Sequence, residues 1–251
     1  MTDLSGLTAI VTGGNSGIGR AMAVGIAKAG ADVAIWARNA ERNAEVVEEI
    51  AALGRRAIAI ACDVTDETAV IDAMEQTVAD LGPLGCFVAN AGTSEYVPIA
   101  EMSLDTWHRI LRTNLDGTFL CTREAARRFI AQGSGGSIVV LSSTISRYGG
   151  AGLGAYATSK TGLLGLSRTL AVELARHKVR CNTLIPGWTR TALTAALQAD
   201  ERFMAATTGR TPVRRWADPH EFEEVAAFLA DPTLTFHTGN EVIVDGGYTI
   251  F

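Results

Sequence analysis

Cysteine and histidine are scarce in this sequence of 251 residues, and neither is spaced for metal binding. The four cysteines include no Cys-x-x-Cys pair, and each lies within or beside an apolar run. They are Cys62, Cys86, Cys121 and Cys181. The four histidines are His108, His177, His220 and His237, which also lack metal-ligand spacing. We therefore expect small buried thiols in a reducing compartment and no catalytic metal.

Long hydrophobic segments and clusters of basic residues are absent as well. No apolar run reaches about 18 residues, and residues 1–7 have no basic region ahead of their apolar side chains, so we expect neither a membrane span nor a secretion signal. The formal net charge is −5, and the arginines form no basic stripe for nucleic acid. These features predict a cytoplasmic protein without nucleic-acid or membrane partners.

Apolar segments typical of strands alternate with helical patterns along most of the chain. With 47% hydrophobic and 20% charged residues, the chain can bury a large core, and we expect one domain over residues 1–251. The strand-like segments lie at residues 8–12, 32–37, 56–61, 86–89, 136–142, 179–185 and 241–244. This alternation predicts an α/β fold, a doubly wound, seven-stranded parallel sheet of the Rossmann type with helices on both faces.

A glycine-rich turn follows the first strand directly and precedes a helical pattern. Gly13, Gly17 and Gly19 form Gly-x-x-x-Gly-x-Gly, a spacing that differs from the common Gly-x-Gly-x-x-Gly fingerprint. Glycines let the backbone approach a diphosphate, and the unpaired amides that begin a helix attract its charge. We therefore expect dinucleotide binding here, although a tight turn without a ligand is the alternative. The expected contacts are Gly13, Asn15, Ser16, Gly17, Ile18 and Gly19.

The residues after the second and third strands bear on the choice of cofactor. An acidic residue at the end of the second strand would bind the ribose hydroxyls of NAD, but this chain has Ala37 followed by Arg38. A guanidinium can pair with a 2′-phosphate, so the sequence favours NADP, with NAD still possible. Arg38 could instead stack on adenine or face water. Asp63 and Val64 are expected beside the adenine, although Asp63 could simply cap its loop.

The predicted chemistry centres on Tyr156 and Lys160, which lie one turn apart on a helix that begins near Ala155. Ionising a tyrosine at neutral pH requires about 4 kcal/mol, and a cation at ~4 Å supplies a similar amount at an effective dielectric of ~20. Ser143 ends a buried strand, where it could hold a substrate oxygen beside the phenol. Asn114 is polar among apolar neighbours and should have a partner, either as a brace for the site or as a satisfied core amide. A tyrosine four residues before a lysine is common on helices without any catalytic role.

The remaining segments are predicted to complete the site and the packing. Thr189 and Thr191 lie where a nicotinamide carboxamide could bind, and residues 190–215 are interpreted as a mobile lid with substrate contacts. A long helix over residues 104–132 should pack inward, and the apolar tail at 248–251 suggests contact with a neighbouring subunit. The inward side chains expected on that helix are Trp107, Leu111, Leu115 and Phe119. The expected pocket positions are Ser94, Glu95, Tyr96, Arg147, Tyr148, Leu153 and Trp188, of which Glu95 and Arg147 favour a polar substrate if both point inward.

Several motifs occur in the order typical of one family. They are Thr12-Gly13-x-x-x-Gly17-x-Gly19, Asn90-Ala91-Gly92, Asn114, Ser143, Tyr156-x-x-x-Lys160 and Pro186-Gly187. Over nearly its whole length the chain therefore resembles the short-chain dehydrogenase/reductase family. The resemblance implies that Tyr156 is the general acid/base and that Lys160 binds the nicotinamide ribose and lowers the tyrosine pKa. It further implies that Ser143 orients the substrate and Asn114 holds a water in a proton relay.

The resemblance also implies an NAD(P)-dependent oxidoreductase acting on CH-OH groups and a homotetramer built on the two long helices. The matching motif residues Asn90, Ala91, Gly92, Pro186 and Gly187 are expected to contact the cofactor, together with Tyr156 and Lys160. The nearest likenesses are to 3-oxoacyl thioester reductases and to sugar-acid dehydrogenases of the gluconate 5-dehydrogenase type, which the motifs do not separate. An NAD-dependent sugar-acid or polyol dehydrogenase is one alternative. A dinucleotide-binding protein without chemistry and a nucleotide-sugar epimerase or dehydratase are the others.

Overall fold

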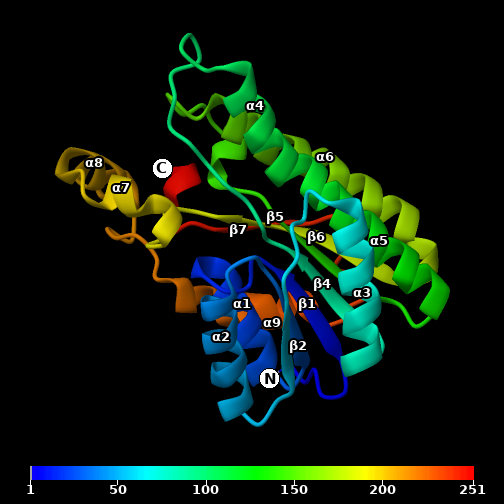
Figure 1. Cartoon of the computed structure of the whole chain (residues 1–251). Coiled ribbons are helices and arrows are strands. Elements are labelled where there is room, and N and C mark those ends of the chain that lie inside the picture. The colour runs from blue at the N-terminus through cyan, green and yellow to red at the C-terminus, as the bar shows by residue number, and fades with distance from the viewer. Residues whose placement is uncertain (1) are drawn as a thin grey trace.

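The computed structural model describes residues 2–251 and contains one seven-stranded sheet in the order β3-β2-β1-β4-β5-β6-β7 (Figure 1). Every neighbouring pair of strands is parallel. The strands are β1 (Thr8–Thr12), β2 (Asp32–Trp36), β3 (Ala57–Ile60), β4 (Leu84–Ala89), β5 (Gly136–Leu141), β6 (Val179–Pro186) and β7 (Glu241–Val244). The predicted doubly wound parallel sheet is confirmed, and β7 lies at its edge.

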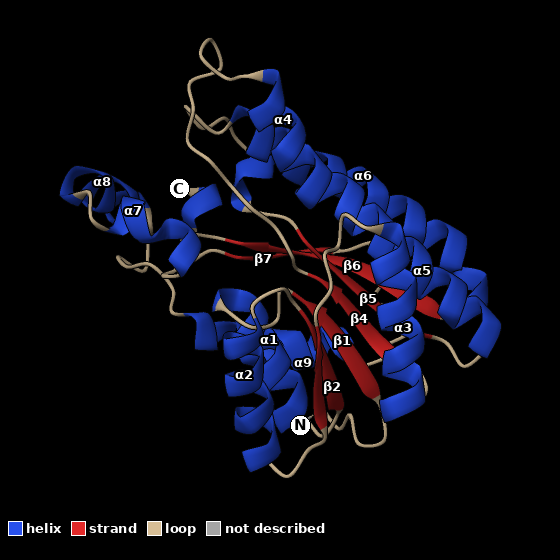
Figure 2. Ribbon diagram, in the orientation of Figure 1, coloured by secondary structure: helices blue, strands red, loops and turns tan. Residues whose placement is uncertain are grey.

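Helices cover both faces of the sheet (Figure 2). One face packs against α1 (Gly17–Lys28), α2 (Ala40–Ala52) and α9 (Glu223–Ala230). The other packs against α3 (Glu67–Leu81), α5 (Gly117–Gln132) and α6 (Gly154–Leu174). Alternate residues of a strand enter the two cores: Ile10 packs in one, and Ala9 and Val11 pack in the other. Because both faces are buried, these strands read as continuous apolar runs in the sequence.

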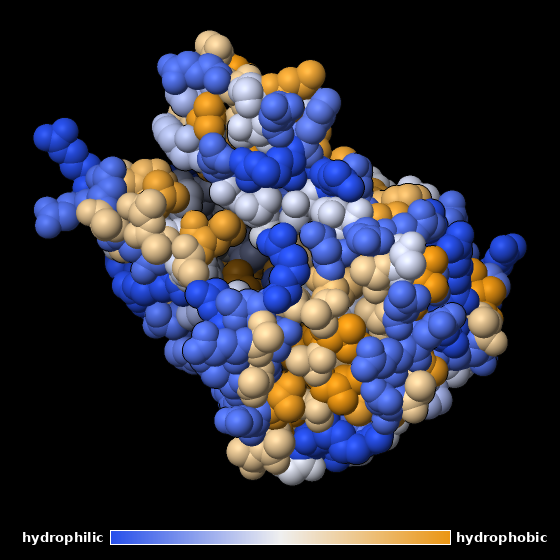
Figure 3. Space-filling model, in the orientation of Figure 1, coloured by the Kyte–Doolittle hydropathy of each residue, from blue (hydrophilic) through white to orange (hydrophobic). Residues whose placement is uncertain are grey.

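The strand order reverses at β1, whose neighbours are β2 on one side and β4 on the other. In open parallel sheets, the crevice at the carboxyl ends of such strands is the usual ligand site. The space-filling view shows a hollow at this edge of the sheet (Figure 3). It lies between the segment of α7 (Ala195–Gln198) and α8 (Glu201–Arg210) and the region of α4 (Leu104–Leu111). The fold thus places the glycine turn after β1 and the loops after β4 and β5 around one opening.

The helix predicted over residues 104–132 is interrupted. It consists of α4 (Leu104–Leu111), a π-helical turn at Arg112–Asp116, and α5. The wider turn contains an extra residue, which rotates the face that follows it. Phe119 is consequently 44% exposed rather than buried, whereas Ile110 and Cys121 lie in the interior. Of the four side chains expected to point inward, Phe119 was wrong, whereas Leu115 is partly buried and packs against the core.

Other expectations concern membranes, metals and thiols. None of the helices in the described part of the chain is long and apolar enough to cross a membrane. Within residues 2–251, no group of three or more acidic, histidine or cysteine side chains is placed to hold a metal ion. All four cysteines are buried with free thiols, in agreement with the sequence-based prediction.

Candidate active site

The glycine turn places the start of helix α1 at the opening, and the capping residue Ser16 makes no side-chain bond to the first backbone amides of this helix. Gly13 and Gly17 have φ values of +62° and +53°, a backbone region that favours glycine. The first turn of α1 contains no acidic residue. Helix α2, in contrast, is capped by the side chain of Asn39. The start of α1 is therefore free to bind an anion such as a diphosphate.

A hydrogen-bonded cluster joins this turn to the loop after β4. Thr12 Oγ1 accepts from the backbone amides of Asn90 and Ala91 at 2.9 and 3.0 Å. The Asn90 side chain donates to the Thr12 carbonyl at 2.8 Å. A Cβ added at Gly19 would lie 2.3 Å from Asn90 Nδ2, so only glycine fits this approach. The motif that begins at Asn90 was expected near the cofactor, but the bridging role of the Thr12 hydroxyl was not predicted from the sequence.

A cavity of about 750 Å³ extends from the glycine turn over the ends of β2 and β3. Arg38 lies on its wall with a largely exposed side chain, and its Nη1 is 3.7 Å from Asp63 Oδ2. Asp63 also accepts from the amide and hydroxyl of Thr65 at 2.9 and 2.8 Å, and these bonds lower the pKa of its carboxyl group. Asp63 therefore both caps its loop and lines the cavity. Val64 also lines this cavity.

Arg42, in the first turn of α2, is a second cation on the wall of this cavity, and it was not predicted from the sequence. The available signal was only that a second arginine follows Arg38 near the start of the next helix. The two guanidinium groups give this end of the cavity a positive wall, which suits a phosphate ester.

Ser143, Tyr156 and Lys160 lie together at the carboxyl end of β5. Tyr156 lines two adjoining cavities, one of about 180 Å³ that it shares with Lys160 and the glycine turn, and one of about 130 Å³ that it shares with Ser143. Lys160 Nζ donates to the Leu141 carbonyl at 2.8 Å and is 5.8 Å from the centre of the Tyr156 ring. The structure thus brings the three side chains to the junction of two cavities.

The protonation states of this group depend on burial. Burial raises the pKa of the Tyr156 phenol, and the Ser143 hydroxyl lowers it by a smaller amount. Burial also lowers the pKa of Lys160 to about 8. In this structure the Lys160 ammonium group bonds to the Leu141 carbonyl rather than to the phenol, so the lowering of the tyrosine pKa by the lysine stays a prediction. At neutral pH the phenol is neutral, which is the form that can donate a proton, and most of the lysine is cationic.

Asn114 braces the site from the π-helical turn. Its amide nitrogen donates to the Thr93 carbonyl at 2.9 Å and to Ser159 Oγ at 3.0 Å, and its oxygen accepts from the Thr93 amide at 2.7 Å. Ser159 Oγ in turn donates to the Tyr156 carbonyl at 2.7 Å. The buried amide therefore has partners, as expected, and it ties the loop after β4 to the helix that carries Tyr156.

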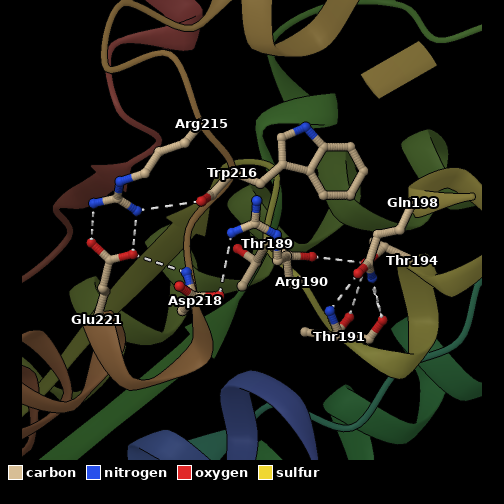
Figure 4. A network of polar contacts seen from close by, with 9 residues as sticks. All are labelled: Thr189, Arg190, Thr191, Thr194, Gln198, Arg215, Trp216, Asp218 and Glu221. Atoms are coloured by element: carbon tan, nitrogen blue, oxygen red, sulfur yellow. Dashed lines mark hydrogen bonds and ion pairs between the residues drawn. The ribbon is translucent and has the colours of Figure 1, made fainter. Parts of the chain in front are cut away.

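Residues 190–215, expected as a mobile lid, are largely helical. The segment contains a short 3₁₀ turn, α7 (Ala195–Gln198) and α8 (Glu201–Arg210). Figure 4 shows the bonds at its base: Thr194 Oγ1 donates to the Thr189 carbonyl at 2.8 Å, and Gln198 Nε2 donates to the Thr191 carbonyl at 2.9 Å. After α8, Arg215 pairs with Glu221 through two bonds of 2.6 Å. Hydrogen bonds therefore hold both ends of the segment.

The smaller cavity beside Tyr156 contains part of the expected pocket. Four of the expected positions, Ser94, Tyr148, Leu153 and Trp188, line it, as do Pro186, Gly187, Thr189 and Thr191. Glu95 and Arg147 do not line it, because Glu95 pairs with Arg109 and Arg147 pairs with Glu241. The polar pocket expected from Glu95 and Arg147 is therefore wrong. Tyr96, also expected there, is 61% exposed and lies outside the cavity wall.

Three apolar wall residues were missed: Ile145, Leu193 and Leu197. The spacing of four between the two leucines was the only hint in the sequence. Tyr248, from the C-terminal tail, is buried within its own chain, with its ring 5.5 Å from that of Tyr148. The next apolar residues of the tail, Ile250 and Phe251, are 88% and 70% exposed.

A doubly wound sheet with a glycine turn, an anion-binding helix start and a Ser-Tyr-Lys group is typical of a dinucleotide-dependent oxidoreductase. A family model described as "Enoyl-(Acyl carrier protein) reductase" matches residues 13–249. The chain belongs to the short-chain dehydrogenase/reductase family. The sequence-based assignment to this family of NAD(P)-dependent oxidoreductases is confirmed.

Named relatives are similar over nearly their whole length. The chain is 34% identical to the 2-dehydro-3-deoxy-D-gluconate 5-dehydrogenase of Escherichia coli (strain K12), covering 98% of this chain and 96% of that protein. It is 40% identical to the cis-4-hydroxycyclohexanecarboxylate dehydrogenase of Sinomonas cyclohexanicum, with 96% of each chain covered. Its structure resembles a gluconate 5-dehydrogenase from Burkholderia cenocepacia J2315 in complex with NADP and tartrate. The TM-score is 0.95 at 33% identity, over 100% of this chain and 98% of the other.

Proposed function

We propose that the protein transfers a hydride reversibly between NADP(H) and a carbonyl or secondary alcohol, with Tyr156 as general acid/base. One observation carries the proposal: Tyr156 lies where the cavity of the glycine turn meets the cavity that contains Ser143. A group in this position can reach a substrate oxygen while the substrate carbon faces the cofactor. Proton transfer by such a positioned side chain contributes about 10² to 10⁴ in rate.

The residues present fit a dinucleotide phosphate. The free amides at the start of α1 would hold the diphosphate, and Arg38 and Arg42 would pair with the 2′-phosphate. Lys160 would bind the nicotinamide ribose, and Thr189 and Thr191 the carboxamide. When bound, the cofactor supplies or accepts the hydride. The similar Burkholderia enzyme forms a complex with NADP, which supports NADP over NAD.

Each side chain of the catalytic group has a separate role in reduction. The Ser143 hydroxyl donates to the substrate carbonyl oxygen and holds it beside Tyr156. The neutral phenol donates its proton to that oxygen as the alcohol forms, and the nearby Lys160 cation offsets the charge left on the tyrosine. Asn114 positions the helix of Tyr156 through Ser159, and we propose that it also holds a water in the proton relay.

An NAD-dependent sugar-acid or polyol dehydrogenase is the second candidate, and the names of several relatives favour a sugar-acid substrate. A dinucleotide-binding protein without catalysis is a third, against which the intact Ser143, Tyr156 and Lys160 argue. Steady-state oxidation of NADPH, and separately of NADH, with 3-ketoacyl thioesters, keto-sugars and simple ketones separates the three. The non-catalytic candidate requires that none of these compounds be turned over.

The proposal extends to the organisation of the protein. We propose one domain over residues 1–251, with residues 190–215 acting as a lid over the substrate. We also propose that the protein is a homotetramer, because it exposes four large apolar side chains that could lie at subunit contacts: Phe119, Val172, Ile250 and Phe251. We propose that it is located in the cytoplasm, because its buried free thiols suit a reducing compartment.

The catalytic assignment is tested with Tyr156→Phe, which removes only the hydroxyl. We expect turnover to fall by about 10³-fold while NADPH binding, measured by calorimetry, stays within a factor of a few. Tyr96→Phe is the matched control, because Tyr96 is exposed and lies outside the cavities that contain Tyr156. Near-normal rates in Tyr156→Phe would show that the assignment is wrong.

A further inference from the structure

The cavity beside Tyr156 is walled mainly by apolar side chains. Ile145, Leu153 and Trp188 lie on one part of the wall, and Leu193 and Leu197 from the lid segment lie on another. Among residues 2–251, none of those that line this cavity is Asp, Glu, Lys, Arg or His. A substrate held here would meet hydrocarbon over most of its surface.

Several of the hydroxyl groups on the wall already bond to partners within the protein. Thr144 Oγ1 lies 3.2 Å from Tyr148 Oη, and Thr189 Oγ1 donates to the Gly187 carbonyl at 3.0 Å. Thr194 Oγ1 donates to the Thr189 carbonyl at 2.8 Å (Figure 4). A polyol would therefore bury several hydroxyl groups without matching partners, which is unfavourable.

The cations around the cavity are also engaged elsewhere. Arg147 is paired with Glu241, and Arg190 lies 3.5 Å from Asp218 Oδ1. Arg210 on α8 has its guanidinium over the rings of Tyr248 and Tyr148, 4.4 and 5.2 Å from their centres, and it does not line the cavity. A substrate carboxylate in the cavity would thus lose its hydration without gaining a charged partner.

The volume of the cavity gives an upper limit for the part of the substrate that it can enclose, because Thr189 and Thr191 on the same wall are also expected to contact the nicotinamide carboxamide. It is about 130 Å³, close to the ~150 Å³ of an apolar cavity that takes up benzene and several times the ~30 Å³ of one water. A six-membered carbocycle is of this size.

We infer that the substrate is a compact neutral ketone or secondary alcohol, with an apolar body of about six carbons and one oxygen at the reacting carbon, rather than a sugar acid. This inference rests on the proposed function. In reduction, the carbonyl carbon gains the hydride of NADPH and the carbonyl oxygen gains the Tyr156 proton. The products are the secondary alcohol and NADP⁺, and solvent restores the proton on the tyrosine. Ser143 and Tyr156 suffice for the single oxygen, and the apolar wall holds the ring.

The test compares two ketones of matched ring size that differ in charge, 4-methylcyclohexanone and 4-oxocyclohexanecarboxylate. We expect kcat/KM for NADPH oxidation to be about 100-fold higher with the neutral ketone. Open-chain 5-keto-D-gluconate should be poorer than both. Equal values for the matched pair, or a preference for either carboxylate, would overturn the inference.

Two variants test which residues cause the preference for the neutral ketone over the carboxylate. Leu197→Arg places a cation on the wall and should raise the ratio of carboxylate to neutral turnover by at least about 10-fold. Arg210→Ala should leave that ratio unchanged, because Arg210 lies off the wall. A wild-type preference for the carboxylate that disappears in Arg210→Ala would identify Arg210 as its receptor and refute the neutral-substrate inference.

Failure of the proposed function gives a different result. If none of the ketones is reduced although NADPH binds, the oxidoreductase proposal fails, and the substrate inference is then decided by calorimetric binding of the matched pair to the NADPH complex. Tighter binding of 4-methylcyclohexanone retains the inference. Tighter or equal binding of the carboxylate, or no binding of either, overturns it.

Discussion

Lys160→Met should make the free protein more stable while removing its activity. Lys160 is only 5% exposed, and within residues 2–251 its ammonium group donates to one protein acceptor, the Leu141 carbonyl at 2.8 Å. Burial lowers the pKa of its ammonium group from 10.5 to about 8. At 1.36 kcal/mol per pKa unit, this difference means that the folded state disfavours the charged lysine by about 3 kcal/mol. Part of the gain on substitution, about 1 kcal/mol, is offset because the Leu141 carbonyl loses its partner.

The effect depends on pH in a defined direction. Between the folded pKa of about 8 and the unfolded value of 10.5, the unfolded chain binds more protons at Lys160 than the folded protein does. The free energy of unfolding of the wild type therefore rises with pH in this window through Lys160, and that of Lys160→Met does not. The stability advantage of the variant should shrink by about 2 kcal/mol from pH 7 to pH 9.5.

Urea unfolding followed by circular dichroism at both pH values measures this difference. Burial raises the pKa of the Cys62 thiol to about 11 and those of Cys86 and Cys181 to about 12, but these groups are common to both proteins and cancel. Lys178→Met, at an exposed position, is the matched control and should show no such change with pH. A difference between Lys160→Met and wild type that is the same at both pH values would refute the reasoning.

Three further predictions concern the cofactor, the brace and the assembly. Arg38→Ala should weaken NADPH binding about 10-fold or more, with little effect on NADH in a calorimetric titration; equal losses would remove the basis for NADP preference. Asn114→Ala should lower the free energy of unfolding by about 2 kcal/mol, because it leaves the Thr93 amide and carbonyl without partners; an unchanged urea midpoint would contradict this. Deleting residues 250–251 should shift the protein toward smaller oligomers in analytical ultracentrifugation, and an unchanged distribution would show that the tail is not at an interface.

The sequence by itself determined those features that depend on residues close together along the chain, such as the strands, the glycine turn and the pairing of Tyr156 with Lys160. Strands buried on both faces are largely apolar, so the central residues of β1 and β5 are visible as continuous runs. The glycine turn is visible because only glycine readily adopts the φ of Gly13 and Gly17. Tyr156 and Lys160 are neighbours through helical spacing alone. These features led to the fold and to the family.

The tertiary structure decided what depends on residues distant in sequence. The π-helical turn rotated the face of α5, so Phe119 turned outward, although nothing in the local pattern distinguished this from a continuous helix. Arg147 does not line the pocket, because it forms an ion pair with Glu241 from β7.

The tertiary structure also decided whether the pKa of Tyr156 is raised or lowered. This pKa depends on how completely the surrounding chain excludes water and on which acceptor Lys160 finds, and that acceptor is the carbonyl at the end of β5. Local spacing fixes which groups are neighbours along a helix, because the backbone geometry repeats. Burial and long-range partners fix their charge and orientation, because these depend on every element packed around them.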